Sequence, residues 1–137
     1  MGRGRVKVFV DTSAFYASIN PDDLHHVAAR KILDDLENEG AQLLTTNYVL
    51  LECASLIQRR KGFSPTKEFL VRVHESVDVL WINERAHRES LTTWEKGRSR
   101  GLSLVDCASF SAMRQAGIRR ALAFDPHFAQ HGFEVIP

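Results

Sequence analysis

Short apolar runs alternate along the chain with longer segments of helical pattern, and this alternation limits the possible folds more than any other property of the sequence. The run VKVFV at 6–10 is apolar and β-branched, which is typical of a strand buried on both faces. The segment 22–40 then spaces its apolar residues as a helix does and ends at Gly40. Such alternation predicts right-handed crossovers and a parallel sheet with helices on both faces.

The pattern continues to the C-terminus without a linker, a repeat or a low-complexity segment. With 137 residues, of which 44% are hydrophobic, the chain has the size and composition of one α/β domain spanning 1–137. Asn47 and Ser64 are expected to cap two of the helices. The expected strands are 6–10, 41–45, 77–82, 120–124 and 133–136, the expected helices are 22–40, 47–62, 64–76, 83–97 and 103–117, and 125–132 is a turn or one short helix.

Two aspartates follow expected strands directly, Asp11 after 6–10 and Asp125 after 120–124. Each has an ordinary explanation, because Asp11 can cap a helix TSAFYAS and Asp125 can cap a helix with Pro126 in its first turn. Sites in parallel α/β sheets nevertheless form at the carboxyl ends of the strands. Two strands that each end in Asp place two carboxylates at the same edge, so capping and function are compatible here.

Glu52 and Asp106 lie on expected helices. The helical neighbours of Glu52 are mainly apolar, so we expect this carboxylate to be partly buried with a partner or to line a polar pocket. Asp106 belongs to the sequence SLVD, which fits a capping box with Ser103 as the N-cap. The capping box alone explains Asp106, but it also places the acid at a helix N-terminus beside the sheet edge.

Helix caps explain three of these acids singly and leave the set of four unexplained. Carboxylates that converge at one edge repel one another. A hard divalent cation with oxygen ligands, Mg²⁺ or Mn²⁺, relieves that repulsion. Such an ion activates water and stabilises the charge that develops on phosphate oxygens. The acids therefore indicate metal-dependent phosphate chemistry.

At these residues the chain resembles the PIN-domain nucleases, and its single-domain length is similar to the VapC-type toxins of toxin–antitoxin pairs. The resemblance rests on VFVDTSAFYA, TTNYVLLECASLIQRR, GLSLVDCASFSAMRQAG and ALAFDPHFAQHGFEVIP, which come in the family's order and cover nearly the whole chain. It implies a three-layer α/β/α sandwich around a mostly parallel sheet. It also implies Mg²⁺- or Mn²⁺-dependent endonucleolytic hydrolysis of RNA that leaves a 5′-phosphate and a 3′-hydroxyl.

The resemblance assigns roles residue by residue. It implies that Asp11 and Asp106 hold the metal most directly, that Asp125 completes the acidic pocket, and that Glu52 ligates the metal or orients the attacking water. The family often carries Thr where this chain has Ala123, so one hydroxyl is lost near Asp125. The resemblance also implies that hydroxyl groups near the acids support them, and these belong to Thr12, Ser13 and Ser103.

The partners implied by the resemblance are an RNA substrate, a small antitoxin and a second copy of the chain in a homodimer. A housekeeping RNA-processing nuclease and a non-catalytic interaction module of the same fold are alternatives. A phosphatase of the haloacid dehalogenase type needs a second Asp at the position of Ser13. A receiver needs a Lys late in the sheet, and no Lys occurs after Lys96. A dinucleotide-binding fold needs its G-x-G after the first strand, and the sequence GRG precedes that strand. These three classes are therefore disfavoured.

The net charge of +1 says little about partners, so the position of the basic residues matters more. The loop KGRSRG leads into Ser103 and Asp106, and we expect Arg98 and Arg100 in it to contact RNA phosphates. Further basic candidates are Arg59, Arg60, Lys61, Arg114, Arg119 and Arg120.

The remaining residues with chemical potential have ordinary interpretations. Cys53 and Cys107 lie in apolar contexts without metal-binding spacing, which predicts buried free thiols in a reducing compartment. Trp81 and Trp94 are expected in the core or in an interface. No apolar run has the length of a membrane span, so we expect a cytoplasmic protein. Four histidines are possible metal ligands, but none forms an HxxxH pair on a clear helix face, so we expect them at the surface; they are His25, His26, His127 and His131.

Overall fold

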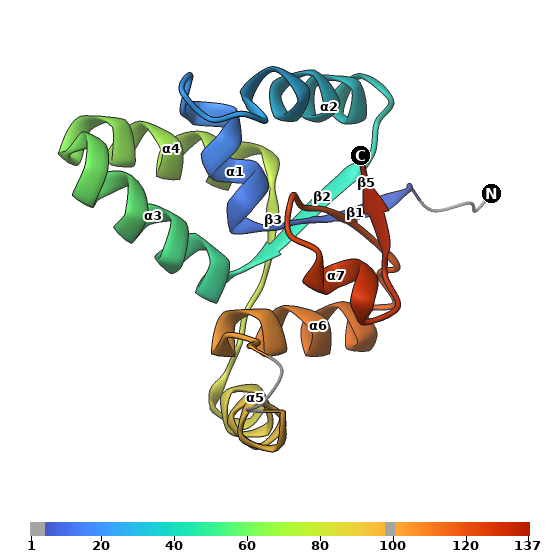
Figure 1. The fold of residues 1–137 in the computed structure, drawn as a ribbon. Coiled ribbons are helices and arrows are strands. Elements are labelled where there is room, and N and C mark those ends of the chain that lie inside the picture. Colours follow the sequence, from blue (N-terminus) through green and yellow to red (C-terminus); the bar gives the residue numbers. More distant parts are fainter. Residues whose placement is uncertain (1–4, 98–100) are drawn as a thin grey trace.

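A five-stranded sheet in the order β3-β2-β1-β4-β5 forms the centre of the computed structural model, which describes residues 5–97 and 101–137 (Figure 1). Each pair of neighbouring strands is parallel, which confirms the predicted α/β class and makes the sheet wholly parallel. The strands are β1 (Lys7–Val10), β2 (Gln42–Thr46), β3 (Asp78–Leu80), β4 (Arg120–Leu122) and β5 (Glu134–Ile136).

Helices cover both faces of this sheet, as the parallel crossovers require. In Figure 1, α1, α2 and α4 lie on one side of the sheet, and α5 and α6 lie on the other, which confirms the expected three-layer sandwich. No helix in the described part of the chain is long and apolar enough to cross a membrane. The helices are α1 (Thr12–Ile19), α2 (His26–Asn38), α3 (Asn47–Lys61), α4 (Phe63–Ser76), α5 (Glu84–Lys96), α6 (Leu104–Ala116) and α7 (His127–Gln130).

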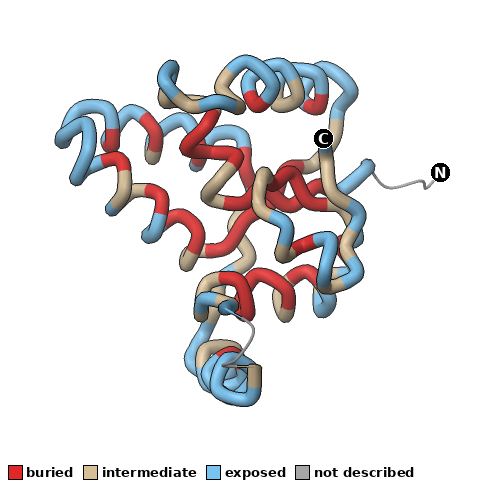
Figure 2. The backbone as a smooth tube through the Cα atoms, viewed as in Figure 1, coloured by how far each residue is buried: buried red, intermediate tan, exposed pale blue. Residues whose placement is uncertain are grey.

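The core is built around β1, whose Val8, Phe9 and Val10 are fully buried (Figure 2). The ring of Phe128, from the short helix α7, is also fully buried. Its centroid lies 6.1 Å from that of Phe9 and 5.0 Å from that of Phe110 on α6. This contact fixes α7 to the central strand and to α6, so the residue before Phe128 has a defined position at the end of the sheet.

Helix starts are encoded locally, and the structure confirms some predicted caps and changes others. The capping box of Ser103 and Asp106 is present at the start of α6. Thr46, not Asn47, caps α3, because Thr46 ends β2 in an extended conformation and its hydroxyl meets the N–H of Val49 at 3.1 Å. Gly62 ends α3 with a φ of +91° and is also the N-cap of α4, so Ser64 stands inside the helix.

Other expectations about local structure were wrong. The helix expected at 22–40 begins only at His26, because the side chains of Asn20 and Asp23 accept hydrogen bonds from N–H groups two residues on and hold a turn. Trp81 is 69% exposed and Trp94 is 43% exposed, so neither belongs to the core, and their place in an interface stays a prediction. Cys53 and Cys107 are buried and unbridged, as expected.

The reciprocal hydrogen bonds at the start of α6 predict a measurable contribution to stability. Ser103→Ala removes the hydroxyl that accepts the N–H of Asp106, and we expect the free energy of unfolding to fall by about 1 kcal/mol. Ser103→Thr keeps a hydroxyl in the same place and should lose less than half as much. Urea unfolding of the metal-free protein measures both variants, and equal losses would contradict the capping role.

Candidate active site

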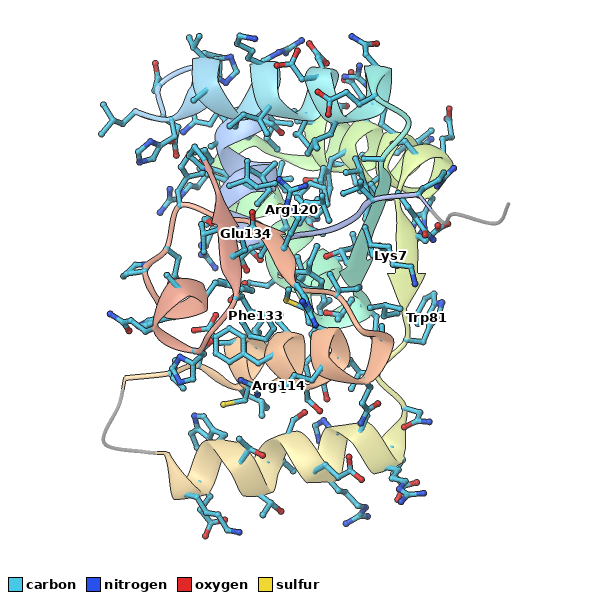
Figure 3. The ribbon with its side chains drawn as sticks, turned by 90° about the vertical axis from the view of Figure 1, so that its right-hand side faces the viewer. Lys7, Trp81, Arg114, Arg120, Phe133 and Glu134 are labelled. Carbon is cyan, nitrogen blue, oxygen red and sulfur yellow. The ribbon has the colours of Figure 1, made fainter. Side chains whose placement is uncertain are left out.

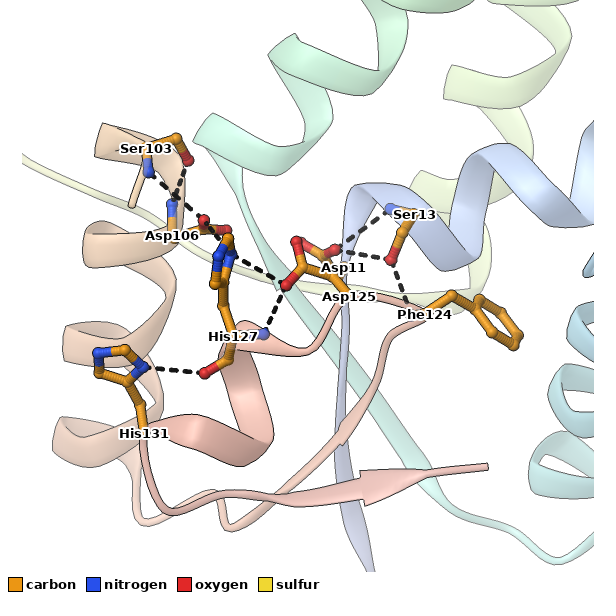
Figure 4. A network of polar contacts seen from close by, with 8 residues as sticks. All are labelled: Asp11, Ser13, Ser103, Asp106, Phe124, Asp125, His127 and His131. Carbon is orange, nitrogen blue, oxygen red and sulfur yellow. Dashed lines mark hydrogen bonds and ion pairs between the residues drawn. The ribbon is translucent and has the colours of Figure 1, made fainter. Parts of the chain in front are cut away.

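The acids gather where the strands end. Asp11 directly follows β1, and Asp125 comes three residues after the end of the neighbouring strand β4. Asp106 reaches the same edge from the first turn of α6, in the layer that covers one face of the sheet. Figure 4 shows these three carboxylates together. The prediction that strand-end acids meet at one edge of the sheet therefore holds in the structure.

Asp11 is the most buried acid of the group, with 5% of its surface exposed. It caps α1, and its Oδ2 accepts hydrogen bonds from the N–H of Ser13 at 3.2 Å and from the hydroxyl of Ser13 at 2.8 Å. The oxygen of that hydroxyl accepts the N–H of Phe124 at 3.0 Å, directly before Asp125. Ser13 therefore joins the ends of β1 and β4 while it orients Asp11.

Asp106 is held by the capping box. Its N–H donates to Oγ of Ser103 at 3.0 Å, and its Oδ2 lies 3.4 Å from the N–H of Ser103. Only 12% of its side chain is exposed. The same hydrogen bonds that start α6 therefore hold the carboxylate beside the sheet edge.

Asp125 does not cap a helix with Pro126 at its first position, because α7 begins at His127 and Pro126 itself stands at the N-cap. Oδ1 of Asp125 accepts the N–H of His127 at 2.7 Å across this turn. The turn brings the imidazole of His127 to the acids, with Nδ1 at 3.0 Å from Oδ1 of Asp125 and at 3.3 Å from Oδ2 of Asp106. Among the described residues, Asp106, Asp125 and His127 form the group whose ligand atoms all lie within 4.8 Å of one another.

Sequence reasoning missed His127 because it sought histidines paired along a helix. The sequence feature that could have indicated His127 is the spacing Asp-x-His after a strand. In this spacing the aspartate accepts the N–H of the histidine, and the turn places the histidine side chain near the strand end. The other histidines that were considered lie elsewhere: His25 stacks on Phe124 with centroids 4.3 Å apart, and His131 stacks on Phe110 at 4.8 Å.

For Glu52 the structure contradicts the first of the two expected positions, partial burial, and leaves the second, a place lining a polar pocket, as a prediction. Glu52 is exposed rather than partly buried, because α3 projects from the end of β2 and leaves this face of the helix open to water. Its Oε1 accepts a hydrogen bond from the hydroxyl of Thr12 at 2.5 Å. Thr12 directly follows Asp11, so this bond places Glu52 at the rim of the acidic group.

The basic candidates occupy different places. Arg119 and Arg120 stand at the start of β4, so they lie at the edge of the sheet opposite to the acids and do not flank them. Figure 3 shows Arg120 beside Glu134, with Nε 3.5 Å from Oε1, and Arg114 over the ring of Phe133 at 5.1 Å. Arg98 and Arg100 lie outside the described residues. The basic residues of α3 lie in its last turn, far along the helix from Glu52, and they are Arg59, Arg60 and Lys61.

Burial and mutual repulsion set the electrostatics of the group. Burial raises the pKa of Asp11 from 3.8 to about 6, the hydrogen bonds from Ser13 oppose this shift, and the charges of Asp106 and Asp125 add to it. Burial also raises the pKa of Asp106, and the charge of Asp125 raises it further. Each ionised carboxylate therefore makes its neighbours harder to ionise.

These donors fit a divalent cation. Carboxylate oxygens are the ligands of Mg²⁺ and Mn²⁺, and a cation would relieve the repulsion from neighbouring acids that adds to the effect of burial on the pKa of Asp11 and of Asp106. The Nδ1 atom of His127 is buried and has no aligned hydrogen-bond partner, although two carboxylates stand close to it. The fold and this edge define a class: a three-layer α/β/α protein with an acidic centre suited to a metal ion.

Comparison with known proteins identifies the family within that class. The PIN domain profile matches residues 8–134. The chain is 32% identical over 132 residues to the 23S rRNA-specific endonuclease VapC20 of Mycobacterium tuberculosis, across 95% of this chain and 98% of that protein. The chain therefore belongs to the PIN domain family.

Solved structures agree with this assignment. The crystal structure of Mycobacterium tuberculosis VapC20, described as a sarcin-ricin loop cleaving toxin, matches with a TM-score of 0.82 at 30% identity, over 92% of this chain and 95% of that one. VapBC2 of Rickettsia felis, bound to a DNA fragment from its promoter, matches with a TM-score of 0.71 at 12% identity, over 96% and 98% of the two chains. At that identity the second match supports the fold alone.

The raised pKa of Asp11 predicts how stability depends on pH. The folded chain keeps this proton at pH values where the unfolded chain has lost it, so the free energy of unfolding falls as the pH rises from about 4 to about 6. Asp11→Asn removes this titration and keeps an oxygen that accepts both hydrogen bonds of Ser13. In EDTA at about pH 7.5, we expect the variant to be more stable than the wild type by on the order of 2 kcal/mol.

At about pH 4.5 the difference between this variant and the wild type should fall to roughly a third, because Asp11 is then protonated in the folded protein while most unfolded chains have already lost the proton. Urea unfolding at both pH values measures it. Asp35→Asn, at an exposed aspartate of α2, serves as the control. If Asp11→Asn increased the free energy of unfolding by the same amount at both pH values, the raised pKa of the buried Asp11 would be contradicted.

Proposed function

We propose that this chain is a divalent-metal-dependent endoribonuclease that acts as the toxin of a toxin–antitoxin pair. The observation that carries the proposal is the convergence of three carboxylates at the carboxyl edge of a parallel sheet, two of them with raised pKa values. Membership of the PIN domain family supports the same activity. The proposed unit is one nuclease domain spanning 1–137.

Asp11, Asp106 and Asp125 are the residues that would hold Mg²⁺ or Mn²⁺. When bound, such an ion supplies an activated water and neutralises charge on the phosphodiester. Ser13 and Ser103 support the site by donating hydrogen bonds to Asp11 and Asp106, which fixes the carboxylates before a metal arrives. The protein thus contributes a preorganised set of oxygen ligands.

Glu52 acts at the rim of this group. It is exposed and bonded to Thr12, so it can accept a hydrogen bond from an attacking water and orient that water toward a phosphodiester. No side chain needs to form a covalent intermediate. Direct hydrolysis leaves a 5′-phosphate and a 3′-hydroxyl as the products.

The substrate and partners follow from the relatives. VapC20, at 32% identity, is named for the 23S rRNA that it cleaves, so 23S rRNA is the first RNA to test as a substrate of this chain. The VapC20 structure, at 30% identity, is described as a toxin, and the resemblance to VapC-type toxins implies a small antitoxin as the partner of this chain. We place the activity in the cytoplasm, expect a homodimer, and retain Arg98 and Arg100 as RNA contacts.

Cleavage of ribosomal RNA by purified protein tests the activity. With Mg²⁺ or Mn²⁺ we expect a discrete 23S rRNA fragment, which EDTA abolishes. Asp11→Asn and Asp106→Asn each remove a proposed metal ligand and should lower the cleavage rate by at least about 100-fold. The control Asp35→Asn changes an exposed aspartate on α2 and should cleave at the wild-type rate. Metal-dependent cleavage that survives both site substitutions would sink the proposed site.

Growth after induced expression tests the toxin role. The wild type should arrest growth, because cleavage of ribosomal RNA stops translation, and Asp106→Asn at equal protein level should not. Co-expression of the neighbouring open reading frame should restore growth. Unimpaired growth with active, well-expressed wild type would favour a housekeeping nuclease, and optical density with quantitative immunoblotting provides the measurement.

A further inference from the structure

His127 presents an unsatisfied nitrogen to the acidic group. Its Nδ1 atom is buried, and its N–H direction aligns with neither neighbouring carboxylate, although Oδ1 of Asp125 lies at 3.0 Å and Oδ2 of Asp106 at 3.3 Å (Figure 4). A buried ring nitrogen without a hydrogen-bond partner is rare in folded proteins. Its position therefore calls for a ligand that all three side chains can share.

We propose that Nδ1 of His127 is a metal ligand beside Asp106 and Asp125, and that it makes the site prefer a first-row transition ion such as Mn²⁺ over Mg²⁺. The proposal deepens the proposed function, since it rests on the same metal site. It goes beyond the four acids, because it adds a nitrogen donor and thereby selects the ion.

The spacing of the three donors supports ligation. Around a six-coordinate ion with ligands at about 2.1 Å, neighbouring ligand atoms lie roughly 3.0 Å apart. The separations of Nδ1 from the two carboxylate oxygens, 3.0 and 3.3 Å, are close to this value. A hydrogen bond to either carboxylate would instead align the ring N–H with that oxygen, and the structure has neither bond aligned.

The fold holds this ring in place from several sides. The backbone N–H of His127 is bonded to Asp125, and its carbonyl oxygen lies 2.9 Å from Nδ1 of His131. The next residue, Phe128, is fully buried against Phe9 and Phe110. The backbone that carries the imidazole is therefore anchored by its hydrogen bond to Asp125 and by the packing of Phe128, which helps to preorganise a metal ligand.

The donor type determines which ion benefits. Mg²⁺ prefers oxygen ligands and keeps most of its waters, so a nitrogen in its coordination sphere gains little. Divalent ions of the first transition row bind imidazole more strongly, and their affinity for mixed nitrogen and oxygen sites rises from Mn²⁺ onward. His127 thus favours these ions without weakening the carboxylate set that Mg²⁺ also uses.

Electron paramagnetic resonance of bound Mn²⁺ tests the proposal on untagged full-length protein, with Mg²⁺ as the competitor. In the wild type we expect nitrogen-14 coupling typical of a bound imidazole. His127→Ala removes the donor, and His127→Asn replaces it with an amide whose oxygen can serve as the ligand. Both should lose the imidazole coupling and weaken Mn²⁺ binding by at least about tenfold, with less than about a threefold change for Mg²⁺. His74→Ala, at an exposed histidine of α4, should match the wild type.

Bound Mn²⁺ without nitrogen coupling in the wild type, or no Mn²⁺ binding at all, would overturn the proposal. An equal loss of Mn²⁺ and Mg²⁺ affinity in both variants would also overturn it, because it would indicate a structural role for His127. The coupling in the wild type requires no variant, so a variant that fails to fold does not decide the test. RNA cleavage is measured separately. Metal-dependent cleavage without the nitrogen coupling would contradict only the role of His127. Nitrogen coupling without metal-dependent cleavage would contradict the proposed nuclease activity.

Discussion

Repulsion among carboxylates that share one partly dehydrated edge of the sheet is the constraint on which the rest of this structure depends. Asp11 is nearly buried, and the charges of Asp106 and Asp125 oppose its ionisation. Left to side-chain rotation alone, these groups would separate toward water. They stay together because each is held by hydrogen bonds from a neighbouring N–H or hydroxyl group, so local backbone structure opposes the electrostatic repulsion.

Three different parts of the fold supply these restraints: the paired strands β1 and β4, helix α6 and helix α7. The parallel pairing of β1 with β4 places Asp11 and Asp125 at one edge, and the Ser13 hydroxyl joins the two strand ends. The capping box brings Asp106 from α6 on one face of the sheet. Phe128 fixes α7 against the core and so places His127. The acidic group therefore exists only in the folded chain, because Asp11 lies far in sequence from α6, β4 and α7.

The parts that could be predicted from the sequence are those that depend on local rules. Strand-end aspartates and the SLVD capping box have a fixed geometry within a few residues, which is why the capping roles of Asp11, Ser103 and Asp106 were predicted correctly. The exposure of Glu52 could not be predicted, because it depends on the direction in which α3 leaves the sheet. Arg119 and Arg120 were assigned to the wrong edge for a similar reason. They are close to Asp125 in sequence, but β4 lies between them and puts them at the opposite edge of the sheet. His127 required a turn that only the structure displays.

The same hydrogen bonds serve folding and chemistry, and this has a thermodynamic consequence. Because the acids destabilise the metal-free fold near neutral pH, a cation that binds only the folded chain stabilises it by the full binding free energy at its working concentration. Folding and loading of the site are thus linked. An ordinary helix cap would carry no such linkage, since a single solvated carboxylate at a helix N-terminus is stabilised by its own helix. The converging carboxylates are therefore the reason why we propose that Asp11 belongs to a metal centre as well as capping α1.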